Sequence, residues 1–413
     1  MEEALLKLKK RLEGELEWDD LHKKLYATDA SVYKMTPLAV AFPKNKKDLR
    51  QLIYFALAHK TSLIPRTAGT SLAGQCVGSG IVVDVSKYFT EILNLDVENR
   101  TVTVQPGVNR DALNRFLEPH GLFFGPNTST SQYCLLGGML GNNSSGTTSI
   151  RYGVTRDVVI AVETLLSDGS EATFKACDSK ELETKLKNNT QEGKIYHFLF
   201  EALSNPKVQK AITTDFPDVS VHRRNTGYAV DVLLNQHPLN PQGEAFNIAK
   251  LLAGSEGTLA LTTAMTFSLV PIPPKHSVML ALHFNSIQEA MLAVNPVMEH
   301  HLYTCELMDK TILDCTRNHS GYQKNRFFLK GDPKAILLLE LRNHNLSTLK
   351  KELSALEKKV SDSNLSYAAV PLWGEEIELA NELRHAGLGL LGNIVGDSKA
   401  VACIEDTAVP LKD

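Results

Sequence analysis

Hydrophobic residues near the start of the chain follow first a helical and then a strand-like spacing. Between residues 45 and 60 they recur every three or four positions, which predicts an amphipathic helix. Short apolar or β-branched runs at 38–42, 62–65 and 81–85 predict strands on either side of this helix. This order indicates that the chain begins with an α/β arrangement.

Later segments continue the mixture of helices and strands. A strand is expected at 101–105, a helix at 110–117, and a hairpin from the strands 158–166 and 171–174. A proline cluster at 271–274 indicates a boundary. Beyond it, strands and helices alternate as in a split, antiparallel βαβ module. The expected strands there are 278–284, 305–308, 335–341 and 367–370, and the expected helices are 287–299, 346–360 and 375–384.

The composition is that of an ordinary globular protein. Of 413 residues, 43% are hydrophobic and 22% are charged, and 44 basic against 47 acidic residues leave a formal net charge of −3. Because this charge provides no field for a polyanion, nucleic acid is not expected as a partner. No apolar run approaches the roughly 18 residues of a membrane span. Six scattered cysteines, and an N-terminal helix whose leucines are interrupted by charges, predict a cytoplasmic protein with reduced thiols.

A first stretch of small residues, RTAGTSLAGQ at 66–75, directly follows a predicted strand. Without large side chains, successive backbone N–H groups can converge on an anion, and Thr70 and Ser71 add hydroxyl donors. An ordinary glycine-rich turn explains this stretch equally well when it is taken alone. Because no Lys-Ser/Thr pair closes the pattern, hydrolysis of a nucleoside triphosphate is not indicated.

Two further stretches share this composition. Residues 123–153 are rich in Gly, Ser, Thr and Asn with Arg151 as their one charged residue, and such long segments inside a domain are usually functional or disordered. Residues 251–260, LLAGSEGTLA, contain a glycine-flanked turn. A GxGxxG pattern at 387–392 follows a helix-like segment and lacks a βαβ unit, so we reject a nicotinamide-binding Rossmann site and expect a flexible loop there.

The three stretches, in this order and ahead of the proline cluster, resemble the flavin domain of the vanillyl-alcohol oxidase and p-cresol methylhydroxylase superfamily. The chain is most similar to the group of D-lactate dehydrogenase, glycolate oxidase and D-2-hydroxyglutarate dehydrogenase. The segment HRRNTGY at 222–228 resembles the branch in which the flavin domain is fused to an iron–sulfur domain. The resemblance implies an α+β fold, with a two-subdomain FAD-binding fold followed by a partial split-βαβ substrate (cap) domain. We expect a helical segment at 1–35, the FAD-binding domain at 36–272, and an incomplete substrate domain at 273–413.

The resemblance also implies which residues hold FAD. The backbone amides of the first loop would bind the pyrophosphate, and Gln75 would lie near the flavin. The implied FAD-binding residues are Thr67, Ala68, Gly69, Thr70, Ser71, Gln75, Pro126, Thr128, Gly137, Gly138, Asn142, Ser145, Gly146, Gly153, Glu256 and Gly257. The family often has glycine where this chain has Thr67 and Ala68, so φ must stay negative at both. No histidine lies in the first loop, and FAD is therefore expected to be bound non-covalently.

Arg384 matches the arginine that grips the substrate carboxylate in the resemblance, because a guanidinium can donate two parallel hydrogen bonds. Without the resemblance it would be interpreted as a cation at the C-terminal end of a helix. No metal ligand is assigned, since Glu299, His300 and His301 have no ligand-spaced partner. In the family the metal ligands and the catalytic base follow the segment that is 403–410 here. We therefore expect a truncated chain, with the base, a divalent metal and any iron–sulfur cluster outside it.

The implied function is an FAD-dependent dehydrogenase that oxidises a D-2-hydroxy acid of the D-lactate, glycolate or 2-hydroxyglutarate type. A base would take the hydroxyl proton, the α-hydrogen would leave as hydride to the flavin, and an electron carrier would reoxidise it. Two alternatives stay open: an NADPH-dependent flavin reductase of the same superfamily, and a cofactor-binding subunit or fragment without catalysis. The sequence does not choose the substrate, the acceptor or the oligomeric state.

Overall fold

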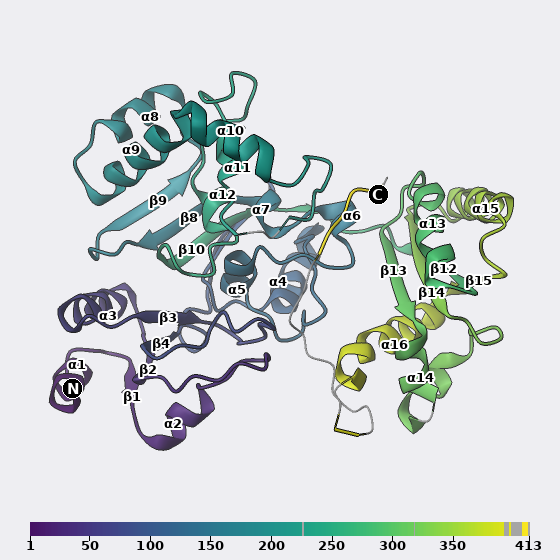
Figure 1. The fold of residues 1–413 in the computed structure, drawn as a ribbon, viewed down its shortest axis with the longest axis horizontal. Coiled ribbons are helices and arrows are strands. Elements are labelled where there is room, and N and C mark those ends of the chain that lie inside the picture. Colours follow the sequence, from purple (N-terminus) through teal and green to yellow (C-terminus); the bar gives the residue numbers. More distant parts are fainter. Residues whose placement is uncertain (225–226, 318, 392–395, 398–406, 412–413) are drawn as a thin grey trace. The chain divides into compact units, whose positions relative to one another are not determined.

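A computed structural model describes residues 1–224, 227–317, 319–391, 396–397 and 407–411, which form two compact units (Figure 1). The first unit consists mainly of residues 1–145 and 154–271, and the second mainly of residues 146–153 and 272–391. Each unit combines helices with at least one β-sheet, so the predicted α+β class is confirmed.

The first sheet of unit 1 has the strand order β1-β2-β4-β3. Its strands are β1 (Glu15–Glu17), β2 (Ala39–Phe42), β3 (Leu63–Arg66) and β4 (Ile81–Asp84). The strands β2, β4 and β3 are parallel, and consecutive parallel strands need a crossover connection, which α3 (Lys46–His59) supplies between β2 and β3. The helix begins where the Asn45 side chain accepts a hydrogen bond from the N–H of Asp48, at 3.0 Å.

The second sheet of unit 1 is antiparallel, with the order β5-β6-β10-β8-β9. Its strands are β5 (Ile92–Asp96), β6 (Thr101–Val104), β8 (Val159–Leu165), β9 (Glu171–Lys175) and β10 (Leu261–Ser268). The pair β8 and β9 is the predicted hairpin. Helices α8 (Ser179–Leu186), α9 (Gln191–Ser204), α10 (Pro206–Asp215), α11 (Val230–Leu234) and α12 (Ala249–Leu252) gather beside it (Figure 1). The remaining elements are α4 (Arg110–Leu117), η1 (Glu118–His120), β7 (Leu122–Phe123), α5 (Leu136–Asn142), α7 (Thr155–Val158) and β11 (Val270–Pro271).

Unit 2 is one antiparallel sheet with helices on both faces. Its order is β13-β14-β12-β15, from β12 (His276–Phe284), β13 (Thr304–Asp309), β14 (Ala335–Asn343) and β15 (Ala368–Trp373). One face packs on α13 (Ile287–Val297) and α15 (Leu346–Ser363), and the other packs on α14 (Lys310–Arg317) and α16 (Glu375–Leu391). The unit also contains α6 (Ser149–Tyr152), η2 (Ser320–Tyr322) and η3 (Lys324–Arg326).

Two sequence expectations differ from the structure. Residues 1–35 are not a purely helical segment: between α1 (Glu2–Lys9) and α2 (Asp20–Leu25), β1 joins the first sheet through β2. The glycines of the GxGxxG pattern that the structure describes do not form a loop, because α16 continues to Leu391. A Cβ on Gly387 would lie 3.3 Å from Ile312 of α14, so the glycine allows the two helices to approach. Gly392 lies outside the described residues.

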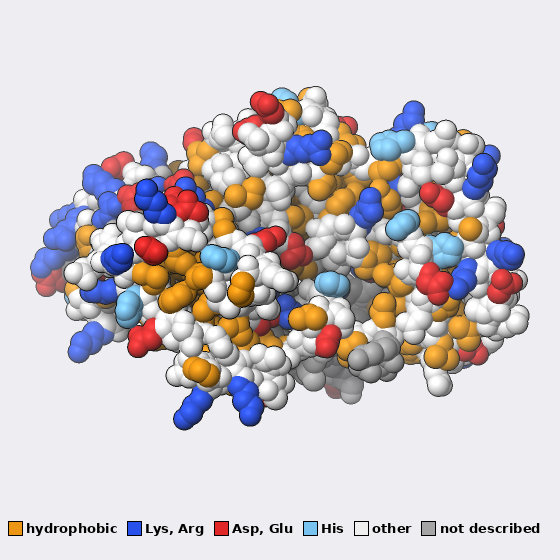
Figure 2. Space-filling view, turned by 90° about the horizontal axis from the view of Figure 1, so that it is seen from above, with side chains coloured by type: hydrophobic (Ala, Val, Ile, Leu, Met, Phe, Trp, Pro, Cys, Tyr) orange, Lys and Arg blue, Asp and Glu red, His pale blue; other side chains and the backbone are white. Residues whose placement is uncertain are grey.

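Acidic and basic side chains are interspersed on the face shown in Figure 2. Some oppositely charged side chains form pairs: Lys46 lies 3.0 Å from Glu163, and Arg50 lies 2.8 Å from Glu171. None of the helices in the described ranges is long and apolar enough to cross a membrane. The five cysteines within those ranges are free thiols, and no cluster of three metal-ligating side chains occurs there.

Candidate functional site

The first loop follows β3 and contains consecutive backbone N–H groups that could bind a ligand. From Thr67 to Ser71, the N–H groups donate to no acceptor within the described part of the chain. Neither Thr67 nor Ala68 has a positive φ, so both tolerate the loss of the family's glycines. Gly69 does require glycine, because its φ is +68° and a Cβ there would lie 2.5 Å from Arg66 Nη2.

Arg66 fixes the start of this loop through contacts with Thr28 and Tyr26. Its Nη1 donates to the carbonyl of Thr28 at 2.7 Å, and its guanidinium stacks over the Tyr26 ring at 5.0 Å. The Tyr26 hydroxyl donates to Asp84 at 2.6 Å, and burial together with this hydrogen bond raises the pKa of the tyrosine. These contacts were missed in the sequence because Arg66 and Thr28 are 38 positions apart and Tyr26 and Asp84 are 58 positions apart.

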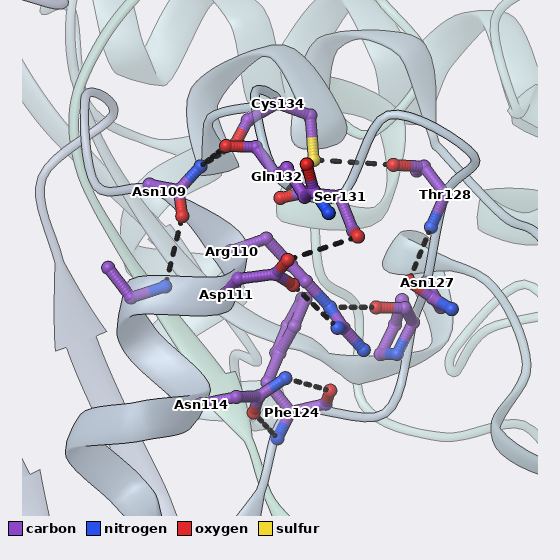
Figure 3. Close-up of polar contacts among 12 residues, drawn as sticks. Asn109, Arg110, Asp111, Asn114, Phe124, Asn127, Thr128, Ser131, Gln132 and Cys134 are labelled. Carbon is purple, nitrogen blue, oxygen red and sulfur yellow. Dashed lines mark hydrogen bonds and ion pairs between the residues drawn. The ribbon is translucent and has the colours of Figure 1, made fainter. Parts of the chain in front are cut away.

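The second loop is held by side chains of α4 and its N-cap (Figure 3). Arg110, which is only 8% exposed, donates from Nε to the carbonyl of Pro126 at 3.1 Å. Asp111 accepts from the hydroxyl of Ser131 at 3.1 Å, and the Thr128 hydroxyl lies 3.3 Å from Cys134 Sγ. Pro126 and Thr128 therefore belong to a segment that α4 fixes in place.

The short helix α5 brings the second loop against the first. A Cβ on Gly137 would lie 2.5 Å from the Cβ of Pro106, and a Cβ on Gly138 would lie 2.6 Å from Oγ1 of Thr67. Both distances are shorter than real Cβ contacts, so only glycine allows this approach. The sequence-predicted residues of loops one and two thus meet at Gly138 and Thr67.

The third loop meets the other two at Glu256. Its N–H donates to the carbonyl of Gly141 at 2.9 Å, and Asn142 Nδ2 donates to Glu256 Oε1 at 3.2 Å. A Cβ on Gly257 would lie 2.9 Å from Cγ of Pro65, at the end of β3. The Gln75 side chain also acts on the Glu256 carboxyl group, whose pKa it lowers.

The last part of the predicted second loop does not pack with the rest. Ser145, the last residue of that stretch in unit 1, accepts a 2.7 Å hydrogen bond from Arg223 Nε. The segment Gly146–Gly153, which contains two of the predicted cofactor residues, instead clusters with unit 2. There the rings of Tyr152 and Tyr303 are 6.1 Å apart, and burial raises the pKa of Tyr152 to about 12.

Arg384 lies in the middle of α16 and not at a helix end, so the interpretation as a C-terminal helix cation is wrong. Its Nε donates to Oε2 of Glu306 on β13 at 2.7 Å, and its Nη2 pairs with the same oxygen. Both side chains are about four-fifths buried. Glu306 was missed in the sequence, where its only signal is a carboxylate between the apolar residues Cys305 and Leu307.

The residues of unit 1 fit a dinucleotide cofactor such as FAD. Five consecutive amide donors that have no acceptor among the described residues match a pyrophosphate, which binds in concavities of this kind. The strand β3 is at the edge of its sheet, and all four of its residues are only partly buried although Leu63 and Ile64 are apolar. Partly covered apolar side chains beside an anion-binding loop suit a ligand that carries both phosphates and flat rings.

Comparison with known families matches residues 37–175 to the FAD binding domain and residues 273–413 to the C-terminal domain of FAD linked oxidases. A D-2-hydroxyglutarate dehydrogenase of Pseudomonas putida is 30% identical over 407 residues, which cover 96% of this chain and 39% of the relative. The glycolate oxidase subunit GlcD of Bacillus subtilis is 25% identical, and 94% of this chain and 68% of the relative are covered. The chain thus spans less than half the length of its dehydrogenase relatives.

Solved structures with the same fold include alkyldihydroxyacetonephosphate synthase, with a TM-score of 0.64 at 15% identity. That match covers 95% of this chain and 64% of the synthase. A BBE-like 1 protein of Physcomitrella patens has a TM-score of 0.57 at 12% identity, with 96% and 69% covered. At these identities the likeness concerns the fold alone.

The two matched domains, together with the three loops, define an FAD-binding protein. The chain carries the FAD binding domain and the C-terminal domain of the FAD linked oxidases, and its cofactor is FAD. The resemblance drawn from the three loops is therefore confirmed.

Proposed function

We propose that this chain serves the FAD-dependent oxidation of a D-2-hydroxy acid, and that Arg384 binds the substrate carboxylate. The observation that carries the proposal is the state of the Arg384 guanidinium. Glu306 occupies Nε and Nη2, which form one edge of the planar group. Within the described residues no acceptor is bonded to Nη1, so part of the second edge is available for a carboxylate.

Glu306 gives Arg384 a fixed orientation before a substrate arrives. The side chains are mostly shielded from water, where a charge-assisted pair is worth more than at an exposed surface. Removing this orientation would leave a long side chain with several rotamers, which would have to be ordered by the substrate itself. We infer that the pair exists to present the guanidinium, as well as to join α16 to β13.

Bound FAD would accept the hydride that leaves the α-carbon of the hydroxy acid. Arg384 would hold the carboxylate next to that carbon and so fix which hydrogen is presented. We assign the hydroxyl proton to none of the described residues, and we propose an electron carrier as the final acceptor. The substrates named for the relatives, D-2-hydroxyglutarate and glycolate, both carry the 2-hydroxy carboxylate that this arrangement requires.

We further propose that FAD is bound without a covalent link. The first loop contains no histidine. Burial raises the pKa of the Cys76 thiol, next to this loop, to about 11, and it also raises the pKa of Cys134 in the second loop. A protonated thiol is a poor nucleophile, so neither cysteine is suited to attack the flavin.

The experiment begins with the FAD-loaded chain, denatured and passed through a filter that retains protein. Flavin in the filtrate is expected, and flavin that stays with the polypeptide would refute non-covalent binding. The native holoprotein is then titrated with D-2-hydroxyglutarate while the flavin spectrum is followed. Arg384→Lys and Arg384→Ala should weaken the response by about ten- to a hundredfold, as expected for one lost charge-assisted pair.

The same titration separates the alternatives. Reduction of the flavin by NADPH, with no response to hydroxy acids, would identify a reductase. Bound FAD that responds to neither compound would identify a cofactor-binding subunit. A normal response in both Arg384 variants would assign this arginine to the packing of α16.

A further inference from the structure

Glu256 has a backbone conformation that glutamate rarely adopts. Its φ is +53°, in the left-handed region, where a side chain with a Cβ is strained. Lys60 and Asn364 share this conformation, but they are exposed C-cap residues of helices α3 and α15. Left-handed residues are common at such helix ends. Glu256 instead lies half-buried in the third loop, so its surroundings must hold it there.

Those surroundings are the other two loops. The N–H of Glu256 donates to Gly141, and the N–H of Gly254 donates to Leu140, both at 2.9 Å, which attaches the third loop to the end of α5. On its other side, Gly257 approaches Pro65, directly before the first loop. The backbone at Glu256 is therefore fixed between loops one and two.

The side chain completes this junction. Asn142 donates from Nδ2 to Glu256 Oε1, and its own oxygen accepts from the Ser144 hydroxyl at 3.0 Å. The side-chain oxygen of Gln75 accepts from the N–H of Ala73 at 3.2 Å, which leaves its NH₂ group toward Glu256, and Gln75 lowers the pKa of that carboxyl group. An amide of the second loop thus hydrogen-bonds the Glu256 carboxyl group, and an amide of the first loop also favours its ionised form.

A carboxylate is the side chain that satisfies both donors, because it accepts hydrogen bonds and donates none. Burial raises the pKa of Glu256, while the hydrogen bonds from Asn142 and Gln75 lower it. The buried carboxyl group is costly to ionise, and the two amides offset that cost. A glutamine of the same size would direct its own NH₂ group at one of the amide donors.

We propose that Glu256 is a positioning residue for FAD: it joins the three loops into one binding surface, and it acts on the cofactor through Gln75, Asn142 and the first loop. The family resemblance implies only that Glu256 belongs to the cofactor site. The structure assigns it the specific task of holding the three loops in register.

The test measures the Kd for FAD of the full chain by the quenching of flavin fluorescence. Glu256→Gln should raise this Kd by about ten- to a hundredfold, because one donor is left facing another donor. The double variant Glu256→Gln with Asn142→Asp exchanges donor and acceptor at the same total charge. It should recover most of the lost affinity.

Two further variants separate the carboxylate from the backbone. Glu256→Gly relieves the left-handed strain but removes the side chain, and it should bind FAD as weakly as Glu256→Gln. Lys60→Gly relieves the same strain at the end of α3, away from the loops, and its Kd should equal that of the wild type. An unchanged Kd in Glu256→Gln or Glu256→Gly, or no recovery in the exchanged pair, would overturn the proposal.

A purely structural role has a different signature. The melting temperature of the apoprotein should change little in Glu256→Gln, whereas the increase caused by added FAD should shrink. If Glu256→Gln does not fold, Gln75→Ala and Asn142→Ala test the same junction from its donor side. Each should raise the Kd for FAD, and an unchanged Kd in both would overturn the proposal.

Discussion

Gly138 of α5 approaches Thr67 so closely that a Cβ on the glycine would lie 2.6 Å from the threonine hydroxyl oxygen. This contact sets the spacing between the first two loops. Gly138→Ala should therefore weaken FAD binding and destabilise the fold by about 1–3 kcal/mol, the usual cost of overpacking. Adding Thr67→Gly should restore part of the FAD affinity and part of the stability, as measured by the Kd for FAD and the melting temperature.

Gly389 provides the control for this prediction. It lies in α16, and a Cβ there would meet no atom within 4 Å. Gly389→Ala should stabilise the chain by about 0.5–1 kcal/mol through helix propensity and leave the Kd for FAD unchanged. Equal effects of Gly138→Ala and Gly389→Ala would contradict the proposed contact between the loops.

Gly69→Val should abolish FAD binding. The position has a φ of +68°, and a side chain there would run into the Arg66 guanidinium that supports the loop. Gly331 is a suitable control, since its φ of +64° carries the same backbone strain but its nearest neighbour would be 3.6 Å away. Gly331→Val should lower the melting temperature and leave flavin binding intact. Retained affinity in Gly69→Val would show that the first loop is an ordinary turn.

Glu306→Gln should affect substrate binding more than folding. The amide keeps the size of the side chain but loses the charge that orients Arg384. We expect the concentration of hydroxy acid at half-saturation to rise about tenfold, as for one weakened charge-assisted hydrogen bond. FAD affinity, measured on the same sample, should not change. A variant with normal saturation by substrate but a lower melting temperature would make the pair only a link between α16 and β13.

His283 makes the second unit sensitive to acid. Its side chain is fully buried in β12, and burial, with repulsion from Lys330, lowers the pKa of the ring below 6.5. The folded state therefore holds His283 neutral, whereas the unfolded state gains a proton as the pH falls below about 6.5. The stability linked to this residue is complete above that pH and is lost as the pH falls toward the folded-state pKa.

His283→Leu should remove this dependence. The melting temperatures of the wild type and the variant are compared between about pH 7.5 and pH 5.5, a range that brackets the unfolded-state pKa. The melting temperature of the wild type should fall further than that of the variant over this range, because other titrating groups affect both chains alike. Identical losses would show that His283 does not contribute to acid sensitivity.

Much of the fold could be predicted because its signals are local. The spacing of apolar residues predicts α3, the hairpin of β8 and β9, and the strands of unit 2. The helix α14 was missed because it is short and only Leu313 and Thr316 are buried in it. The extension of α16 was missed because glycines were read as a loop signal, whereas the packing of Ile312 against Gly387 depends on tertiary structure.

The loops of the site could be predicted from the sequence, but the residues that hold these loops and Arg384 in place could not. The small residues of the first loop are adjacent in sequence, so their composition is visible. Tyr26 and Asp84, whose hydrogen bond supports this loop, are 58 residues apart in the sequence. Glu306 and Arg384 are 78 residues apart. No periodicity links such positions, since their contact exists only after the strands have paired and the helices have packed.

Oxidation of a D-2-hydroxy acid by bound FAD can be measured in an anaerobic titration of the FAD-loaded chain. D-2-hydroxyglutarate, D-lactate and glycolate are added in turn, with L-2-hydroxyglutarate as the stereochemical control, while flavin absorbance is recorded. We predict a saturable change of the flavin spectrum with at least one of the first three compounds and a much weaker change with the L-isomer. An unchanged spectrum with all of them, in protein that carries one FAD per chain, would contradict this prediction.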